Sequence, residues 1–382
     1  MKRAAKIRLL AFAFLPLVLV ALYAAKIYFQ RFSGEIPISS MLENNDITEP
    51  STLATWPLPD AKPQTTHRGV KHWFVSKDGT AVDVFRFSWK ENSRLRWEIL
   101  DGDSDDAKPW DNRVRYWERG VAQATKQLND SGRGPVLAAW NGLFFGYASP
   151  NITSPDSEAF HVSPVVIDGK VRANTANHRW AFGVKYEKDG PKWAIQHLPS
   201  RAWLEQNVQW GGGSAQCLIL DGKPLKVQPF PAPGATPLPQ PVASTPEEAG
   251  HVPIFDHMKT CRASLAWERD GKTLWLVFVK ESDSETASAL AFKYRRALQG
   301  GWTTADVQQF WLALQKQTGP LTAINSDAGD VAQLSFRQPS GNYTLVPPRW
   351  SGAGYDRKTF PPAFQDAPRG GALMFFTVRE AK

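Results

Sequence analysis

The chain has 382 residues, 42% hydrophobic and 12% aromatic, and can bury a sizeable core. Its formal net charge is +8, but six of its 45 basic residues precede Glu35, the first acid. The 39 basic residues that remain are nearly balanced by 37 acidic ones, so the body of the protein offers no electrostatic case for binding nucleic acid.

The N-terminal segment is typical of a membrane-targeting sequence. Basic residues precede an uncharged run from residue 9 to 25, which as a helix would span roughly 26 Å. The C-terminal end of this uncharged run is a poor signal-peptidase cleavage site, so we expect a retained transmembrane helix. A cleaved signal peptide is the alternative. The positive-inside rule predicts a single-pass protein of the inner (plasma) membrane, whose body lies in the periplasm or another extracytoplasmic space.

The chain is predicted to have three parts. Residues 1–32 form the cytoplasmic tip and the transmembrane helix, and residues 33–64, with scattered Pro, Ser and Thr, form a stalk. Residues 65–382 form one folded domain, interrupted by a Pro-rich surface insertion at 227–253.

Hydrophobic periodicity predicts mostly strands in the body. Residues 85–89 and 95–99 alternate as half-buried strands and are expected to pair as a hairpin. Helices are predicted over residues 117–128 and 305–315, the second capped by Thr303 with Asp306 in its first turn. Further strands are expected at residues 136–141, 163–167, 180–185, 215–220, 274–279, 321–327 and 372–378, the last closing the sheet. We predict an α+β fold, with mixed, strand-rich sheets packed against a few helices behind the transmembrane helix.

Two apolar strands end in compressed polar turns. One turn begins at Asn141-Gly142 and the other contains Asn325, Asp327, Gly329 and Asp330. Many folds present catalytic groups at such strand ends, so we expect the two turns to meet in one cleft.

The order of these segments resembles that of the phosphodiester glycosidase family over roughly residues 110 to 380. Asn141-Gly142-Leu143-Phe144-Phe145 is similar to the family's Asn-Gly-Gly-Phe-Phe, and residues 325–332 stand where members have Asn-Leu-Asp-Gly-Gly-Gly-Ser-Ser. Weaker matches are residues 165–170, the glycine turn 210–214 with the strand 218–223, and residues 262–266.

The resemblance implies a hydrolase for sugar-1-phosphodiesters of envelope glycans or their precursors, with a carbohydrate phosphodiester as its partner. Arg262 would hold the phosphate, and Asp327, with Asp330 as a second acid, would activate water or stabilise the sugar cation. The substrate-binding candidates are Asn141, Gly142, Asn325, Gly329, Gly212, Gly213 and His178.

Each of these residues also has an ordinary structural explanation. Arg262 could belong to an ion pair, Asp327 could cap its own turn, and the Asn-Gly and glycine segments could be plain turns. The turn after Asp327 departs from the family pattern at Ala328 and Asp330. Two alternatives therefore stay open, a sugar-phosphate-binding protein of the same fold without catalysis, and an envelope scaffold without a glycan ligand.

We expect no cofactor, with calcium as the alternative. Asp101, Asp103 and Asp105 are spaced as calcium ligands are, but the run lacks the glycine and the closing glutamate of such loops. In an oxidising compartment Cys217 and Cys261 would form a disulfide, or else remain two separate buried thiols.

Overall fold

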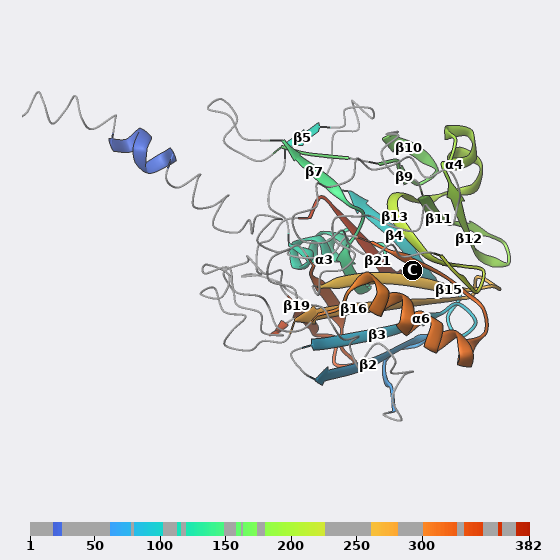
Figure 1. Ribbon diagram of the computed structural model, residues 1–382. Coiled ribbons are helices and arrows are strands. Elements are labelled where there is room, and N and C mark those ends of the chain that lie inside the picture. Colours follow the sequence, from blue (N-terminus) through green and yellow to red (C-terminus); the bar gives the residue numbers. More distant parts are fainter. Residues whose placement is uncertain are drawn as a thin grey trace, which may run out of the picture.

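The protein is described by a computed structural model (Figure 1). It describes residues 18–24, 62–77, 80–101, 113–115, 120–148, 158–161, 163–173, 180–225, 261–281, 301–326, 332–346, 358–360 and 372–382. Within these ranges the fold is strand-rich, with four helices, and every strand pairing is antiparallel. The prediction of mixed sheets is therefore wrong, because no described strand has a parallel neighbour.

The larger of the two main sheets has 12 strands. Its path runs through β1 (Gln64–His67), β2 (Val70–Lys77), β3 (Thr80–Ser88), β16 (Thr273–Glu281), β15 (Arg262–Glu268), β17 (Leu321–Asn325), β13 (Trp210–Leu220), β11 (Trp180–Glu187) and β12 (Gly190–His197). Off this path, β9 (Val165–Ile167) and β14 (Lys223–Pro224) pair with β13, and β10 (Lys170–Ala173) pairs with β9.

The smaller main sheet has six strands. Its order is β20 (Lys358–Phe360), β19 (Tyr343–Val346), β18 (Leu334–Arg337), β6 (Val136–Asn141), β21 (Met374–Glu380) and β4 (Leu95–Asp101). A three-stranded sheet contains β5 (Arg113–Arg115), β8 (Glu158–His161) and β7 (Phe145–Ala148).

The two main sheets pack face to face through large aromatic side chains. Trp97 of β4 lies with its ring centroid 5.8 Å from Phe182 of β11 and 4.9 Å from Phe376 of β21. Phe87 of β3 stacks on Trp140 of β6 at 6.4 Å. All five side chains are buried, and each contributes about 1.5–3 kcal/mol of hydrophobic stabilisation relative to exposure.

A helix covers the outer face of each main sheet. The helix α6 (Thr304–Thr318) buries Val307, Phe310, Trp311 and Leu314 against the 12-stranded sheet, and Figure 1 shows it lying across β15 and β16. The helix α3 (Val121–Asp130) packs in the same way on the six-stranded sheet, while the short α4 (Arg201–Asn207) covers β10 and β11. The protein is thus layered, with its main aromatic core between the sheets.

Several local predictions are confirmed. The second predicted helix forms with Thr303 as its N-cap, and Thr303 and Asp306 make a reciprocal capping box. The first predicted helix ends at Asp130, as the polar residues there indicate, and the strand before Asn141 forms. The strand predicted at 372–378 forms as β21, but it lies between β6 and β4 in the interior of its sheet.

The predicted hairpin between residues 85–89 and 95–99 is wrong. The strand β3 pairs with β2 and β16 in the larger sheet, whereas β4 pairs with β21 in the smaller one. The two strands face each other across the aromatic core, so the chain between them, at Trp89 to Arg94, crosses from one sheet to the other.

The expected transmembrane helix is not supported. Of residues 9–25 the structure describes 18–24, which are helical. Within the described ranges, no helix is long and apolar enough to cross a membrane. The insertion at 227–253 and all but residues 62–64 of the predicted stalk lie outside the described residues.

No disulfide joins Cys217 and Cys261, although both are buried. The strand β17 lies between their strands, because Cys217 pairs with Ile324, which pairs in turn with Leu265 of β15. Two strand spacings separate the cysteines by about 10 Å, before counting the four residues from Leu265 to Cys261. A disulfide requires Cα atoms within about 7 Å, so the predicted bond cannot form in this sheet.

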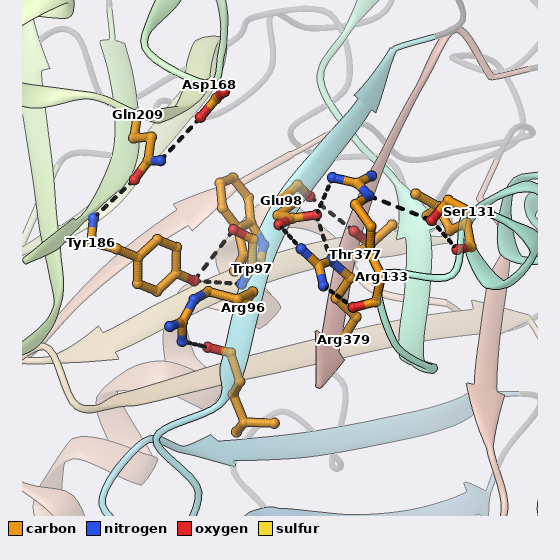
Figure 2. A network of polar contacts seen from close by, with 12 residues as sticks. Arg96, Trp97, Glu98, Ser131, Arg133, Asp168, Tyr186, Gln209, Thr377 and Arg379 are labelled. Carbon is orange, nitrogen blue, oxygen red and sulfur yellow. Dashed lines mark hydrogen bonds and ion pairs between the residues drawn. The ribbon is translucent and has the colours of Figure 1, made fainter. Parts of the chain in front are cut away.

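A buried ion pair ties β4 to β21 beside the core. Figure 2 shows Glu98 held in a fork by Arg379, with nitrogen to oxygen distances of 2.8 and 2.6 Å, and flanked by Arg133. In the same view the Tyr186 hydroxyl of β11 accepts a hydrogen bond from the Trp97 amide of β4. Polar contacts therefore fix the register between neighbouring strands and also between the two sheets.

Glu380, at the end of β21, joins the N-terminal strand to the C-terminal one. Its carboxylate accepts hydrogen bonds from Asn92 at 3.0 Å and Arg94 at 2.6 Å, and it lies 2.9 Å from His67 Nε2 of β1. Burial opposes ionisation, but these three partners outweigh it and hold the pKa of Glu380 below its usual value.

We predict that Glu380→Gln lowers the free energy of unfolding by about 2 kcal/mol at pH 7, since hydrogen bonds to a charged group are lost. A carboxyl whose pKa is lowered by folding stabilises the protein above its unfolded pKa, and this contribution is lost as the pH falls through its folded pKa. The difference in unfolding free energy between the variant and the wild type should therefore shrink as the pH falls below the ordinary Glu pKa of about 4.3, as measured by denaturant titrations. An equal difference at pH 3 and pH 7 would contradict this role of the charge.

Candidate functional site

Four buried polar residues gather where β13, β17 and β15 lie side by side. In this register Asn325 of β17 stands between Gln216 of β13 and Ser264 of β15, and Asn325 Nδ2 donates to Gln216 Oε1 at 3.4 Å. Because the strands are antiparallel, Arg262 lies two residues beyond Ser264 in the direction in which the chain leaves Asn325. We call Gln216, Arg262, Ser264 and Asn325 the Asn325 cluster, and none of its members is more than 2% exposed.

The Asn325 cluster faces α6 rather than the core between the sheets. Trp311 of α6 donates from Nε1 to Ser264 Oγ at 2.7 Å, and Arg262 Nε donates to the carbonyl of Trp302, just before α6, at 3.0 Å. The alternate residues of β15, Ala263 and Leu265, point into the aromatic core. A guanidinium stays charged at any ordinary pH, so Arg262 carries a buried positive charge to this face.

Asn325 carries a polar atom that the fold does not satisfy. Its Oδ1 is buried and has no hydrogen-bond partner in the described part of the chain. Leaving a buried carbonyl oxygen without a donor costs about 1–3 kcal/mol, which the fold could avoid with an apolar side chain. Unsatisfied buried groups of this kind call for an explanation, and a bound ligand is one.

The predicted catalytic acids lie outside the described residues, as do Gly329 and His178. Asp327 and Asp330 belong to the segment 327–331, and the structure describes the chain on either side of it. Before it, the amide and hydroxyl of Ser326 both donate to the Ala263 carbonyl at 3.0 Å. After it, the Ala332 carbonyl accepts from the buried Lys280 Nζ at 3.3 Å. Ser326, the last described residue before this segment, is therefore bonded to the strand that carries Arg262.

Asn141, a predicted substrate ligand, has a structural role. Its side chain is fully buried, and its Oδ1 accepts a hydrogen bond from the Gln333 amide at 3.1 Å. The Gly142 amide donates to the Met374 carbonyl at 2.9 Å, and a Cβ on Gly142 would lie only 3.2 Å from that oxygen. The Asn-Gly pair thus ends β6, and its asparagine anchors the chain at Gln333.

The glycine run of β13 is explained by close packing. A Cβ on Gly212 would meet the Pro164 carbonyl oxygen and the Leu143 side chain, each at 2.4 Å. The Gly213 amide already donates to the Pro164 carbonyl at 2.8 Å, so it is not offered to a phosphate. Leu143, which follows the Asn-Gly turn, therefore lies against Gly212 as a packing partner.

Several buried polar residues were missed by sequence reasoning. Gln216 of the Asn325 cluster and Lys280 of β16 each interrupt an apolar strand, which is the only signal the sequence offers for them. Two buried histidines pair with acids, His72 with Asp83 at 2.8 Å and His161 with Asp101 at 3.0 Å.

No metal site emerges from the described ranges, where no three His, Cys, Asp or Glu side chains are grouped to hold an ion. Of the run once considered for calcium, Asp101 pairs with His161, and Asp103 and Asp105 lie outside the described residues. Calcium at this loop therefore stays an untested alternative.

No protein-family model matches the sequence, and no curated protein matches it significantly. Among solved structures, the catalytic domain of zebrafish N-acetylglucosamine-1-phosphodiester alpha-N-acetylglucosaminidase, auto-inhibited by its pro-peptide, is similar with 13% identity and a TM-score of 0.45, over 89% of this chain and 97% of that one. A hypothetical protein from Synechocystis has 11% identity and a TM-score of 0.44, covering 84% and 64% of the two chains. A putative exported protein from Burkholderia pseudomallei has 10% identity and a TM-score of 0.45, covering 78% and 74%. The likeness is confined to the level of the fold, and no assignment of function follows from it.

Asn141→Leu is predicted to destabilise the protein by about 2 kcal/mol, because the buried Gln333 amide loses its acceptor. Asn207→Leu at the end of α4 is the control, with an expected change within about 0.5 kcal/mol, since Asn207 is only partly buried and bonds within its own helix. Urea unfolding of both variants measures the difference. Unchanged stability of Asn141→Leu together with weaker ligand binding would instead restore Asn141 as a substrate ligand.

Proposed function

We propose that this protein is a hydrolase that cleaves the bond between the anomeric carbon of a sugar and a phosphate oxygen in sugar-1-phosphodiesters. The observation that carries the proposal is the Asn325 cluster, in which a buried guanidinium and an unsatisfied amide oxygen share one face at the end of β17. The sequence continues from this strand end through Ser326 to Asp327.

Arg262 is proposed to bind the phosphate. Its guanidinium can grip two phosphate oxygens at once and remains protonated while negative charge develops on the leaving group. The departing phosphomonoester has a second pKa of about 6, so it leaves as an anion with less help from an acid than an alcohol needs. A fixed cation in a buried site stabilises that charge more strongly than water does.

The carboxylates of Asp327 and Asp330 are proposed to act on the sugar side of the bond. Glycosidic cleavage passes through a transition state that resembles an oxocarbenium ion, which a carboxylate can stabilise or attack. If the two acids stand about 5 Å apart the anomeric configuration is retained, and a wider separation leaves room for an attacking water and inverts it. In this proposal one acid activates water, and the products are a free sugar and a phosphomonoester.

Arg262→Lys is expected to lower kcat for sugar release by about 100-fold or more, because an ammonium cannot reproduce the bidentate contact. Asp327→Asn should abolish measurable release. Arg269→Lys is the matched control and should keep wild-type activity, since Arg269 follows the opposite end of β15, is exposed and pairs with Asp221. The assay follows free reducing sugar from N-acetylglucosamine-1-phosphodiesters and other sugar-1-phosphodiesters, using the full chain.

The same assay separates the proposal from its alternative. The replacement of family glycines by Ala328 and Asp330 favours a protein that binds sugar phosphates without cleaving them. Tight binding of a sugar 1-phosphate without any sugar release would support that alternative. Activity that is equal in wild type, Arg262→Lys and Asp327→Asn would contradict the proposed chemistry.

A further inference from the structure

We propose that Asn325, oriented by Gln216, is the specificity-determining residue of this site, and that its Oδ1 accepts a hydrogen bond from a hydroxyl or amide N–H on the sugar carbon next to the anomeric carbon. The inference rests on the proposed function, because it takes Arg262 as the ligand of the phosphate. Its substrate class is a sugar phosphate with a hydrogen-bond donor beside the phosphorylated carbon.

Asn325 is held in place through its side-chain nitrogen. A side-chain amide has two donor hydrogens and one acceptor oxygen, and Asn325 uses its nitrogen toward Gln216 Oε1. That contact directs the amide across β13 and leaves Oδ1 buried without a donor in the described structure. A purely structural role for Asn325 between two strands would account for the hydrogen bond of its nitrogen, but not for the burial of an oxygen without a donor.

Neighbouring hydroxyls cannot serve this oxygen from within the fold. The Ser264 hydroxyl, directly opposite Asn325, donates its hydrogen to the Ile324 carbonyl and accepts from Trp311. The Ser326 hydroxyl donates to the Ala263 carbonyl. Because each hydroxyl has one hydrogen, both are committed, and neither can donate to Asn325 Oδ1. No donor of the described residues reaches this oxygen, so the missing donor is assigned to a ligand.

The position of Arg262 suggests which ligand brings the donor. Asn325 and Arg262 are diagonal neighbours on one face of the β15–β17 pair, with Cα atoms about 7–8 Å apart. Because this separation is within the length of an arginine side chain, the Arg262 guanidinium can bind a phosphate close to the Asn325 oxygen. In a sugar 1-phosphate the phosphate oxygen and the substituent of the next carbon are attached to adjacent ring atoms, so one ligand can satisfy both groups.

Calorimetric titration of the full chain tests the inference with paired ligands, glucose 1-phosphate or N-acetylglucosamine 1-phosphate against 2-deoxyglucose 1-phosphate. We expect the wild type to bind the donor-bearing ligands about tenfold or more tightly, because the deoxy ligand leaves Oδ1 unsatisfied. Asn325→Leu should bind all three with similar affinity. Gln216→Leu should reduce the preference, and Arg269→Lys, away from the site, should leave it unchanged.

The outcomes separate this inference from the proposed function. A wild type that binds the deoxy ligand equally well overturns the role of Asn325, even if the protein releases sugar from phosphodiesters. A wild type that binds none of the ligands overturns both the inference and the role of Arg262. If Asn325→Leu fails to fold, the wild type alone still tests the role of Asn325. The test is then its preference for the donor-bearing ligands over the deoxy ligand, together with the relative kcat/KM values for the matching phosphodiesters.

Discussion

The structure depends on the burial of one aromatic layer between two antiparallel sheets. Trp97, Phe182 and Phe376 meet there from three strands that are distant in sequence, and the layer continues through Phe87 and Trp140. Interiors of this kind are close-packed, so the faces of the sheets cannot shift without opening cavities or causing clashes. The register of every strand that contributes a side chain to the layer is fixed by this packing.

The packing of the aromatic layer also fixes the position of the Asn325 cluster. Along β15 the side chains of Ala263 and Leu265 enter the aromatic layer, and along β17 Ile324 does the same. Since successive residues of a strand point to opposite faces, Ser264 and Asn325 must face α6. A slip of one residue would put these polar groups into the apolar layer, so the packing that stabilises the fold also aligns the Asn325 cluster.

Features that depend on neighbouring residues could be predicted from the sequence. The capping pair Thr303 and Asp306 lies within four residues and marks the start of α6, and the apolar run before Asn141 gives a strand. Which strands pair could not be predicted, because β3 and β4 alternate equally well and the choice of partner depends on the whole core. The proposed disulfide was wrong for the same reason, since nothing near Cys217 or Cys261 reveals that β17 separates their strands.

The site itself was found only in part from the sequence. Arg262 and Asn325 were identified through the family resemblance, and the structure brings them to one face. Gln216 is marked in the sequence only as a polar residue in an apolar strand, and its partner Asn325 is 109 residues away. Asn141 and the glycines of β13 attracted attention as functional turns, but the structure accounts for them by a backbone hydrogen bond and by close packing.

The first measurement to make is a crystal structure of the protein with a bound sugar 1-phosphate, which tests whether Arg262 and Asn325 share one ligand. We expect a phosphate oxygen within hydrogen-bonding distance of the Arg262 guanidinium, and a donor on the adjacent sugar carbon directed at Asn325 Oδ1. A ligand bound elsewhere, or an Asn325 oxygen satisfied by another group of the protein when the ligand is present, would contradict this expectation.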